Sequence, residues 1–300
     1  ELFERQYFCQ ERRYEYYGFA KPVEDNDAVK HFLPVSEELN IVLPLSIYEK
    51  DGNVLYNTVV VLDCGKILGI YRKTHIPDDH FYQEKFYFTP GNTGFVTFKT
   101  TYGQIGIGIC WDQWFPETAR CLTLNGAELL FYPTAIGSEP ILNCDSMKHW
   151  RNVMKGHAAA NIIPVIAANR YGLEEVTPCD ANGNQSSSLE FYGSGFITDA
   201  TGELLGVGNL CAKLTGEFVE KGYFFFNAHF GKLCLDAASL EYRQISVDTA
   251  YCSGNIGGGG YPSVPCDHSA IFKLVCEGLI ERIHRRNDFF LGIELCENSL

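Results

Sequence analysis

The sequence predicts an α/β protein in which helices cover a parallel or mixed β-sheet. Short apolar runs, which predict buried strands, alternate with stretches of helical spacing between residues 105 and 198. Such alternation is typical of a sheet packed under helices. The chain has 300 residues, of which 46% are hydrophobic and 20% charged. It is therefore long enough for a sizeable core in one domain or two.

The first hundred residues predict one helix and three strands. Residues 1–24 should run from a strand end into a loop rich in aromatic and charged side chains. Apolar residues at helical spacing predict a helix over residues 27–39, although Pro34 inside it should kink or shorten that helix. Residues 78–94 are expected to form an aromatic-rich loop. The strands are predicted at residues 41–48, 56–62 and 67–71.

The stretch from residue 105 to 117 predicts a strand that turns sharply into a helix. It begins as an apolar run, and Pro116 suits the first turn of the helix that follows. Gly126 stands where this helix should end. Cys110 therefore falls at the carboxyl end of a strand, which is the edge where open α/β sheets bind ligands.

Cys110 has two interpretations. Free cysteines are among the most buried residue types, so a core position is the simpler one. Gly106 and Gly108 inside the strand allow a neighbouring group to approach closely, and Trp111 and Trp114 follow directly. These features favour a nucleophile at this position.

The second half of the sheet is predicted from the same patterns. A helix is expected over residues 146–160, with Asp145 as its N-cap. The polar stretch 173–188 is rich in Ser and Asn and predicts a loop. Strands are predicted at residues 128–132, 162–168 and 191–198.

Charge and cysteine usage limit the classes of partner and cofactor. The formal net charge of −13 argues against nucleic acid and anionic membranes, and agrees with a cationic ligand. No apolar stretch approaches the roughly 20 residues of a membrane span. The twelve cysteines include no C-x-x-C pair and no cluster with zinc-site spacing, so we predict no metal site. We interpret the cysteines as free thiols in a reducing compartment, the cytoplasm.

The chain carries three short motifs in order, which are ELFE at residues 1–4, RKTHIP at 72–77 and CWDQWFPE at 110–117. They resemble the glutamate, lysine and cysteine motifs of the nitrilase superfamily, the carbon–nitrogen hydrolases. Within that superfamily, YQEKFYF at residues 82–88 and FYPTAIGSEP at 131–140 resemble the N-carbamoylputrescine amidase branch.

This resemblance implies a four-layer α-β-β-α sandwich of the nitrilase type, whose outer helices form the contacts of a homo-oligomer. It covers residues 1–205, which we expect to be the hydrolase domain, truncated at its start and hence incomplete at the N-terminus. Residues 206–300 depart from the family pattern. We expect this divergent C-terminal segment to be misfolded, disordered, or an isoform or gene-model artefact.

The resemblance also implies an activity without metal or organic cofactor. The substrate would be N-carbamoylputrescine, a small cationic ureido compound, cleaved to putrescine, carbon dioxide and ammonia in polyamine biosynthesis. Cys110 would attack the ureido carbonyl and form a thioester, with Glu1 as general base. Lys73 would lower the thiol pKa and, with the backbone N–H of Trp111, stabilise the oxyanion. Glu84 would be a second carboxylate beside the lysine.

Each of these charged residues also has a simpler interpretation. Glu1 could be a frayed terminus, Lys73 part of a solvated basic pair, and Glu84 a surface charge. His75 and His157 are alternative partners for the thiol.

The same comparison of motifs suggests substrate contacts. Aromatic side chains near the nucleophile would line an apolar pocket for the methylene chain of a diamine. Asp112 is a candidate for the substrate ammonium, or for an orienting role. The predicted substrate-binding residues are Tyr7, Asp112, Trp114, Thr134, Ala135 and Asn169.

Two rival hypotheses remain at this point. The first is another amidohydrolase of the superfamily, such as a β-ureidopropionase or an ω-amidase, whose substrates carry a carboxylate. The second is a catalytically dead fragment. We expect the chain as written to be nearly inactive and poorly soluble, because a strand before Glu1 would be missing and the Phe224–Phe226 run favours aggregation.

Overall fold

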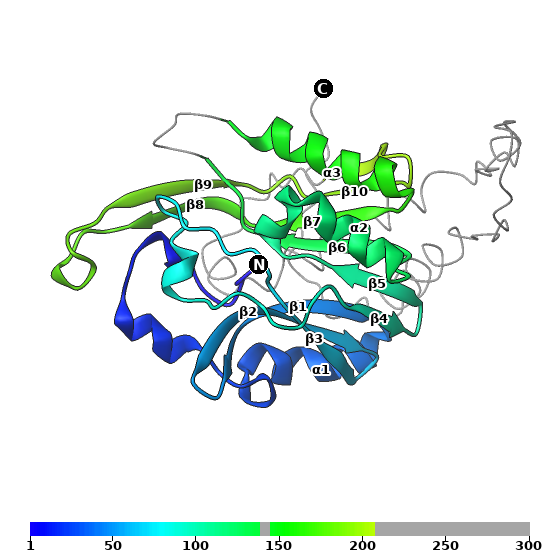
Figure 1. Cartoon of the computed structure of the whole chain (residues 1–300). Coiled ribbons are helices and arrows are strands. Elements are labelled where there is room, and N and C mark those ends of the chain that lie inside the picture. Colours follow the sequence, from blue (N-terminus) through cyan, green and yellow to red (C-terminus); the bar gives the residue numbers. More distant parts are fainter. Residues whose placement is uncertain (139–144, 208–300) are drawn as a thin grey trace, which may run out of the picture. The chain divides into compact units, whose positions relative to one another are not determined.

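A computed structural model describes residues 1–138 and 145–207 of the chain. Within this part, a three-stranded sheet and a six-stranded sheet lie between helices, in the order α-β-β-α (Figure 1). The predicted α/β class and layer order are confirmed. The Phe224–Phe226 run lies outside the described residues, as does nearly all of the expected C-terminal segment.

The first two layers are helix α1 (Asp27–Leu39) and an antiparallel meander of three strands. The strands are β1 (Val42–Asp51), β2 (Val54–Asp63) and β3 (Lys66–Arg72). Leu43, Leu45 and Ile47 of β1 pack with Phe32 of α1. Because side chains alternate along a strand, the residues between them face the second sheet.

Helix α1 has the predicted bounds and continues through Pro34, so the proline does not shorten it. Pro34 removes one backbone donor, but it and Lys30, whose carbonyl loses that partner, lie on the exposed face. Water can hydrogen bond to that carbonyl. The buried face of the helix is unaffected, and Asn26 caps its start by accepting from the Val29 amide at 3.1 Å.

The six-stranded sheet has the order β11-β10-β7-β6-β5-β4. Its strands are β4 (Thr97–Thr100), β5 (Gly103–Ile107), β6 (Leu129–Thr134), β7 (Val165–Asn169), β10 (Phe196–Thr198) and β11 (Leu204–Val207). The three central strands β5, β6 and β7 are parallel, so their carboxyl ends meet at one edge. Helices α2 (Pro116–Leu124) and α3 (Met147–Asn161) cover the outer face, where Trp150 and Met154 pack against Leu130 and Tyr132.

Two predicted segments have a different structure. Residues 1–24 contain no strand and instead form three short 3-10 helices, η1 (Phe8–Gln10), η2 (Tyr14–Phe19) and η3 (Val23–Asp25). The predicted loop 173–188 lies within an antiparallel hairpin: its two ends belong to β8 (Tyr171–Val176) and β9 (Ser187–Tyr192), and residues 177–186 form the connection between them. Few apolar residues mark β8, since only one of its faces packs on the protein. The polar composition of β8 therefore did not predict a strand.

Smaller differences concern element ends. Strand β7 begins at Val165, because Ile162 takes a left-handed conformation at the end of α3. The predicted strand 191–198 is divided between β9 and β10. The N-cap position of α3 is Ser146, while Asp145 accepts from the Met147 amide. Helix α2 begins at Pro116 and ends before Gly126, as predicted.

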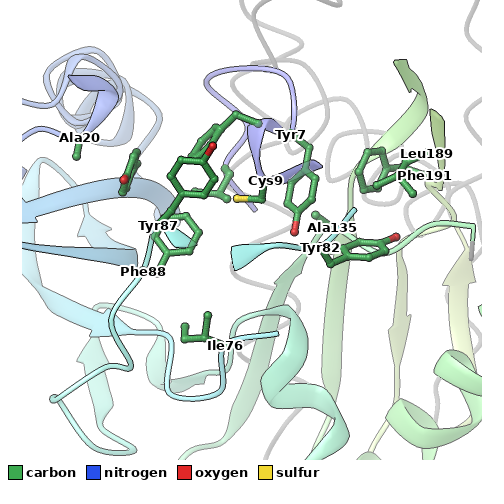
Figure 2. Packing of buried hydrophobic residues seen from close by; sticks show 13 residues of the cluster. Tyr7, Cys9, Ala20, Ile76, Tyr82, Tyr87, Phe88, Ala135, Leu189 and Phe191 are labelled. Carbon is green, nitrogen blue, oxygen red and sulfur yellow. The ribbon is translucent and has the colours of Figure 1, made fainter. Parts of the chain in front are cut away.

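A cluster of aromatic side chains joins the first residues of the chain to the loop before β4 and to β9 (Figure 2). Phe8 stacks on Tyr48 at 5.3 Å and meets Tyr87 edge to face at 5.0 Å. Tyr7 contacts Phe191 at 5.5 Å. The aromatic residues that mark these loops in the sequence therefore form a core. Among the described residues, no helix is long and apolar enough to cross a membrane.

The close approach expected at the strand glycines leads to a stability prediction. A Cβ at Gly108 would lie 2.4 Å from Cε1 of Tyr132, whose ring is fully buried. We expect Gly108→Ala to lower the free energy of unfolding by about 1–3 kcal/mol through overpacking. Gly156 on the exposed face of α3 has no atom within 4 Å of such a Cβ. Gly156→Ala should raise stability by about 0.5–1 kcal/mol. Urea denaturation of both variants measures the contrast, and equal effects would contradict it.

Candidate active site

Cys110 lies where the chain leaves strand β5 and enters the short 3-10 helix η5 (Cys110–Trp114). Its backbone φ is +41°, in the left-handed region that non-glycine residues rarely adopt. The side chain is buried, and its thiol donates to the carbonyl of Ala135 at 3.7 Å. Strained positions of this kind often occur at functional sites, where the surrounding fold holds them.

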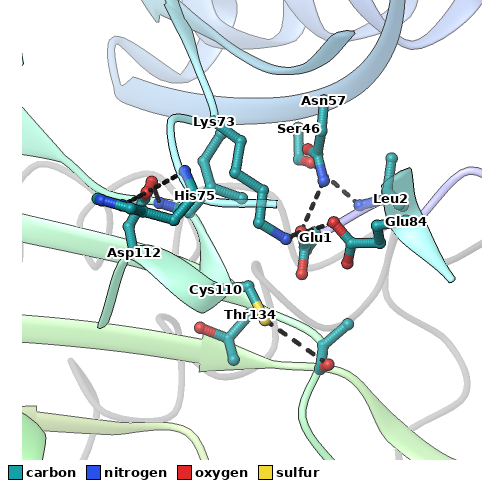
Figure 3. A network of polar contacts seen from close by, with 12 residues as sticks. Glu1, Leu2, Ser46, Asn57, Lys73, His75, Glu84, Cys110, Asp112 and Thr134 are labelled. Atoms are coloured by element: carbon teal, nitrogen blue, oxygen red, sulfur yellow. Dashed lines mark hydrogen bonds and ion pairs between the residues drawn. The ribbon is translucent and has the colours of Figure 1, made fainter. Parts of the chain in front are cut away.

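Lys73 follows strand β3 and places its ammonium between two carboxylates (Figure 3). Lys73 Nζ lies 2.7 Å from Oε1 of Glu1 and 2.6 Å from Oε2 of Glu84. All three side chains are buried. Burial therefore excludes the solvated basic pair and the surface glutamate that the sequence left open. Figure 3 shows the Cys110 sulfur facing this group.

Each carboxylate is fixed by a second donor. The amide of Asn57 donates to Glu1 Oε1 at 2.6 Å, and the Tyr7 hydroxyl donates to Glu84 Oε1 at 2.7 Å. The other oxygen of Glu1 is buried and accepts no hydrogen bond of ordinary geometry within the described structure. The Cys110 thiol lies near enough to the Glu1 carboxylate to contribute to its lowered pKa as a hydrogen-bond donor.

The electrostatics of the site give the base and the thiol different protonation states. Burial raises the pKa of the Glu1 carboxyl, but the charge of Lys73, the neighbouring amino group and hydrogen bonds from Lys73 and Cys110 together outweigh it, and the pKa lies below its ordinary value. Burial and the negative charge of Glu1 raise the pKa of the Cys110 thiol well above its ordinary value, although Lys73 acts in the opposite direction. Lys73 thus lowers the thiol pKa as expected, but burial and the charge of Glu1 outweigh its effect in the free site. Cys110 is a neutral thiol beside an ionised Glu1.

Glu84 titrates nearer to neutrality than Glu1. Burial raises its pKa to about 7, and the negative charge of Glu1 acts in the same direction against the attraction of Lys73. The two carboxylates raise the pKa of Lys73 well above its ordinary value in spite of its burial. The lysine is thus a permanent cation, which suits it for stabilising negative charge.

The predicted oxyanion donor Trp111 occupies the second position of η5. Amides in the first turn of a helix have no partner within it, so this N–H is available at the helix start. The Trp111 side chain is 36% exposed and meets Trp114 edge to face at 6.4 Å. Its backbone therefore belongs to the site more clearly than its ring does.

The structure gives Asp112 an orienting role in place of a substrate contact. Its carboxylate is buried and accepts from the amide and Nδ1 of His75, at 3.0 and 2.7 Å (Figure 3). It also accepts from the Tyr71 hydroxyl at 2.8 Å and the Ile109 amide at 2.9 Å. Both oxygens are used within the protein, where they hold the Cys110 turn against strand β3.

Thr134 and Asn169 lie at the predicted edge, but their side chains are also engaged within the protein. The Thr134 hydroxyl donates to the Tyr132 carbonyl at 3.1 Å. The Asn169 amide accepts from the Ile136 amide at 2.9 Å, and donates to the carbonyls of Ile136 and Gly193 at 2.9 and 3.0 Å. Asn169 thus fixes the chain beyond β6, next to the carbonyl that accepts from the thiol.

The remaining predicted contacts differ in their surroundings. Tyr7 is fully buried and binds Glu84, so it supports a carboxylate and does not line an open pocket. Trp114 is half-buried and stacks on His149 at 5.2 Å. Of the two histidines considered as partners of the thiol, His75 pairs with Asp112, and His157 hydrogen bonds to the carbonyl of Gln113 at 2.7 Å.

Asn57 is a site residue that the sequence analysis did not identify. It lies in strand β2 just before an apolar run, and its side chain is fully buried. A buried amide inside an apolar strand needs hydrogen-bond partners, which is the signal that could have found it. Across the described ranges, no three His, Cys, Asp or Glu side chains are grouped as a metal site requires.

Comparisons with known proteins agree with the motifs. Residues 1–212 match the model of the carbon–nitrogen hydrolase family. An N-carbamoylputrescine amidase of Oryza sativa is 52% identical over 211 residues, which are 70% of this chain and 69% of that protein. A citrullinase of Francisella tularensis is 50% identical over 199 residues, which are 66% of this chain and 67% of that protein. The crystal structure of a carbon–nitrogen hydrolase from Helicobacter pylori is 37% identical, with a TM-score of 0.61 over 68% of this chain and 70% of that one.

The raised pKa of Glu84 predicts a pH dependence of stability. Between its ordinary value of 4.5 and its folded value of about 7, the folded state binds more protons than the unfolded state. The stabilisation by this group is therefore complete below pH 4.5 and is lost as the pH rises through 7. We expect the stability difference between the native chain and Glu84→Gln to fall by on the order of 2–3 kcal/mol from pH 4.5 to 8.

Urea denaturation across this pH range measures the difference. Glu175→Gln, which changes an exposed glutamate of β8, is the matched control. A difference for Glu84→Gln that rises with pH would show that the folded carboxyl has a lowered pKa.

Proposed function

The chain belongs to the carbon–nitrogen hydrolase family, and on that premise we propose that it hydrolyses N-carbamoylputrescine to putrescine, carbon dioxide and ammonia. The enzyme is an amidohydrolase. The observation that carries the proposal is the buried Lys73 ammonium, held by Glu1 and Glu84 beside the Cys110 thiol. This arrangement supplies a nucleophile, a base and a fixed positive charge in one water-poor site.

In the first half-reaction Glu1 takes the proton of Cys110 as the sulfur attacks the ureido carbonyl. A C–S bond forms, and the negative charge that develops on oxygen is stabilised by Lys73 and the Trp111 amide. Glu1 then returns the proton to the terminal nitrogen, and the C–N bond breaks to release ammonia. The neutral resting thiol agrees with this order, because proton transfer and attack occur together.

In the second half-reaction a water molecule hydrolyses the thioester. Glu1 is ionised again and accepts a proton from the water as its oxygen attacks the carbonyl carbon. The C–S bond breaks and the sulfur recovers a proton. The released carbamate then loses carbon dioxide and leaves putrescine. Lys73 serves both tetrahedral intermediates, since both place negative charge on the same oxygen.

The choice of substrate rests on the relatives and on charge. The Oryza relative is named an N-carbamoylputrescine amidase, and the formal net charge of −13 suits a cationic substrate. Citrulline is the second candidate, because the Francisella relative is named a citrullinase. Citrulline bears the same ureido group but also a carboxylate, so it needs a cationic partner in the pocket.

The same proposal includes the setting of the enzyme. We place it in the cytoplasm and in polyamine biosynthesis, as a homo-oligomer without nucleic-acid or membrane partners. Its hydrolase domain is proposed to comprise residues 1–205, close to residue 212 where the family match ends. The oligomeric state is open to sedimentation velocity on the purified chain.

Lys73 should be essential to turnover. Loss of one oxyanion-hole donor costs roughly 2.7–4 kcal/mol in other enzymes, so Lys73→Ala should lower kcat at least a hundredfold. Lys73→Arg should not restore activity, because a planar guanidinium does not fit where a compact ammonium bridges two carboxylates. Steady-state kinetics of ammonia release measures both variants. Near-native turnover by Lys73→Arg would mean that any positive charge suffices.

The substrate assignment is tested by ammonia release from three ureido compounds under matched conditions. We expect kcat/KM for N-carbamoylputrescine to exceed that for citrulline and for N-carbamoyl-β-alanine by at least tenfold, because both rivals bring a carboxylate into a site rich in negative charge. Cys110→Ser is the blank and should lose activity with all three. A preference for citrulline or N-carbamoyl-β-alanine would replace the proposed substrate.

A further inference from the structure

We propose that Arg170 and Glu174 form a positioning pair that holds both carboxylates of the site on Lys73. This inference rests on the proposed function, in which Glu1 is the base that serves Cys110. Neither residue of the pair contacts the reacting atoms. Both act on the segment of residues 1–7, which we call the base segment because Glu1 lies in it.

The base segment lacks the ladder hydrogen bonds of a strand. None of its residues belongs to a β-strand, and Leu2 has a left-handed φ of +48°. The Leu2 amide donates to Oγ of Ser46 at 3.0 Å (Figure 3). A catalytic base must be placed accurately, and side chains from elsewhere in the fold help to position this segment.

Arg170 makes three of the hydrogen bonds to the backbone of this segment. Its Nη2 donates to the carbonyls of Leu2 at 2.5 Å, Arg5 at 3.0 Å and Glu1 at 3.4 Å. Its Nη1 donates to Oε1 of Glu174 at 2.5 Å. The Arg170 side chain is only 11% exposed, so water screens these contacts weakly.

Glu174 extends the connection to the second carboxylate. Its Oε2 accepts from the backbone amide of Tyr7, and the hydroxyl of the same tyrosine donates to Glu84. The hydrogen bonds therefore form a closed ring, which passes through Arg170, Glu174, Tyr7, Glu84, Lys73 and Glu1. A displacement of Arg170 or Glu174 would therefore move both carboxylates that contact Lys73.

The backbone of Arg170 is hydrogen bonded to the strand end that also holds the nucleophile. The Arg170 amide donates to the Thr134 carbonyl at 3.0 Å, and its carbonyl accepts from the Gly193 amide at 2.9 Å. Thr134 is followed by Ala135, the residue whose carbonyl accepts from the Cys110 thiol. Arg170 thus joins the base segment to the strand end that holds the thiol, and so sets the spacing between base and nucleophile.

Removal of the guanidinium should disturb base placement more than substrate binding. We expect Arg170→Met in the full chain to lower kcat by about 10- to 100-fold with KM changed less than twofold, as small misplacements of catalytic groups do. The kcat of Arg170→Lys should fall between those of the native chain and Arg170→Met, because an ammonium cannot reach three carbonyls and Glu174 together. Glu174→Gln keeps an acceptor for the Tyr7 amide and should cost only a few fold.

A direct measure of base placement is the alkylation rate of Cys110. We would treat each variant with iodoacetamide across pH and identify the modified cysteine by peptide mass mapping. Arg170→Met should lower the Cys110 rate at least tenfold. Its acid limb should move to higher pH, because Glu1 held less closely on Lys73 regains a higher pKa. A merely structural residue would leave that limb in place.

Arg120→Met is the control, since Arg120 also donates to a backbone carbonyl, that of Ala160, but joins α2 to α3. It should leave rate and pH limb unchanged. Native-like circular dichroism with an unchanged Cys110 rate and limb in Arg170→Met would overturn the proposal. If that variant does not fold, an unchanged rate and limb in Glu174→Gln would overturn it. An Arg170-dependent alkylation rate without turnover of any ureido compound would instead overturn the proposed function alone.

Discussion

The structure depends on one electrostatic constraint, the burial of an ammonium that cannot lose its charge. A buried cation is tolerated only where opposite charge and hydrogen bonds replace its water, and Lys73 meets this condition with Glu1 and Glu84. Two carboxylates around one ammonium leave an excess of negative charge. Burial raises the pKa of Glu84 and of the Cys110 thiol, and the negative charge of Glu1 acts in the same direction. The site therefore rests as a neutral thiol beside an ionised base, and the charge that supports catalysis is already fixed.

The same constraint applies to other polar side chains near the site, which make their hydrogen bonds within the protein. Asp112 gives its oxygens to groups on β3 and on the Cys110 turn, and Asn169 gives its amide to the chain after β6. Neither is free for a ligand. They hold the left-handed Cys110 and the Ala135 carbonyl at the edge where the parallel strands end. The polar residues at this edge thus hold the reacting groups in position.

The β8–β9 hairpin connects this layer to the base segment. It is a two-stranded ribbon outside the main sheets, and its polar face gives it little core of its own. The hairpin contributes Glu174 of β8, which forms an ion pair with Arg170, the residue just before β8. The aromatic cluster around Tyr7 and Phe191 packs beneath that pair. Charge and aromatic packing therefore fix the same segment from two sides.

The sequence by itself determined the α/β class, the turn at Cys110 and the identity of the chemical groups, because periodicity, Pro116 and short contiguous motifs are local properties. Only the tertiary structure decided how these groups act. Glu1 meets Lys73 across 72 positions of the chain, and Asp112 and Asn169 serve the fold although their position suggested a ligand contact. The hairpin at residues 171–192 and the raised thiol pKa likewise follow from long-range pairing and burial. Burial and hydrogen-bond partners are set by residues distant in the chain, so a local pattern does not contain them.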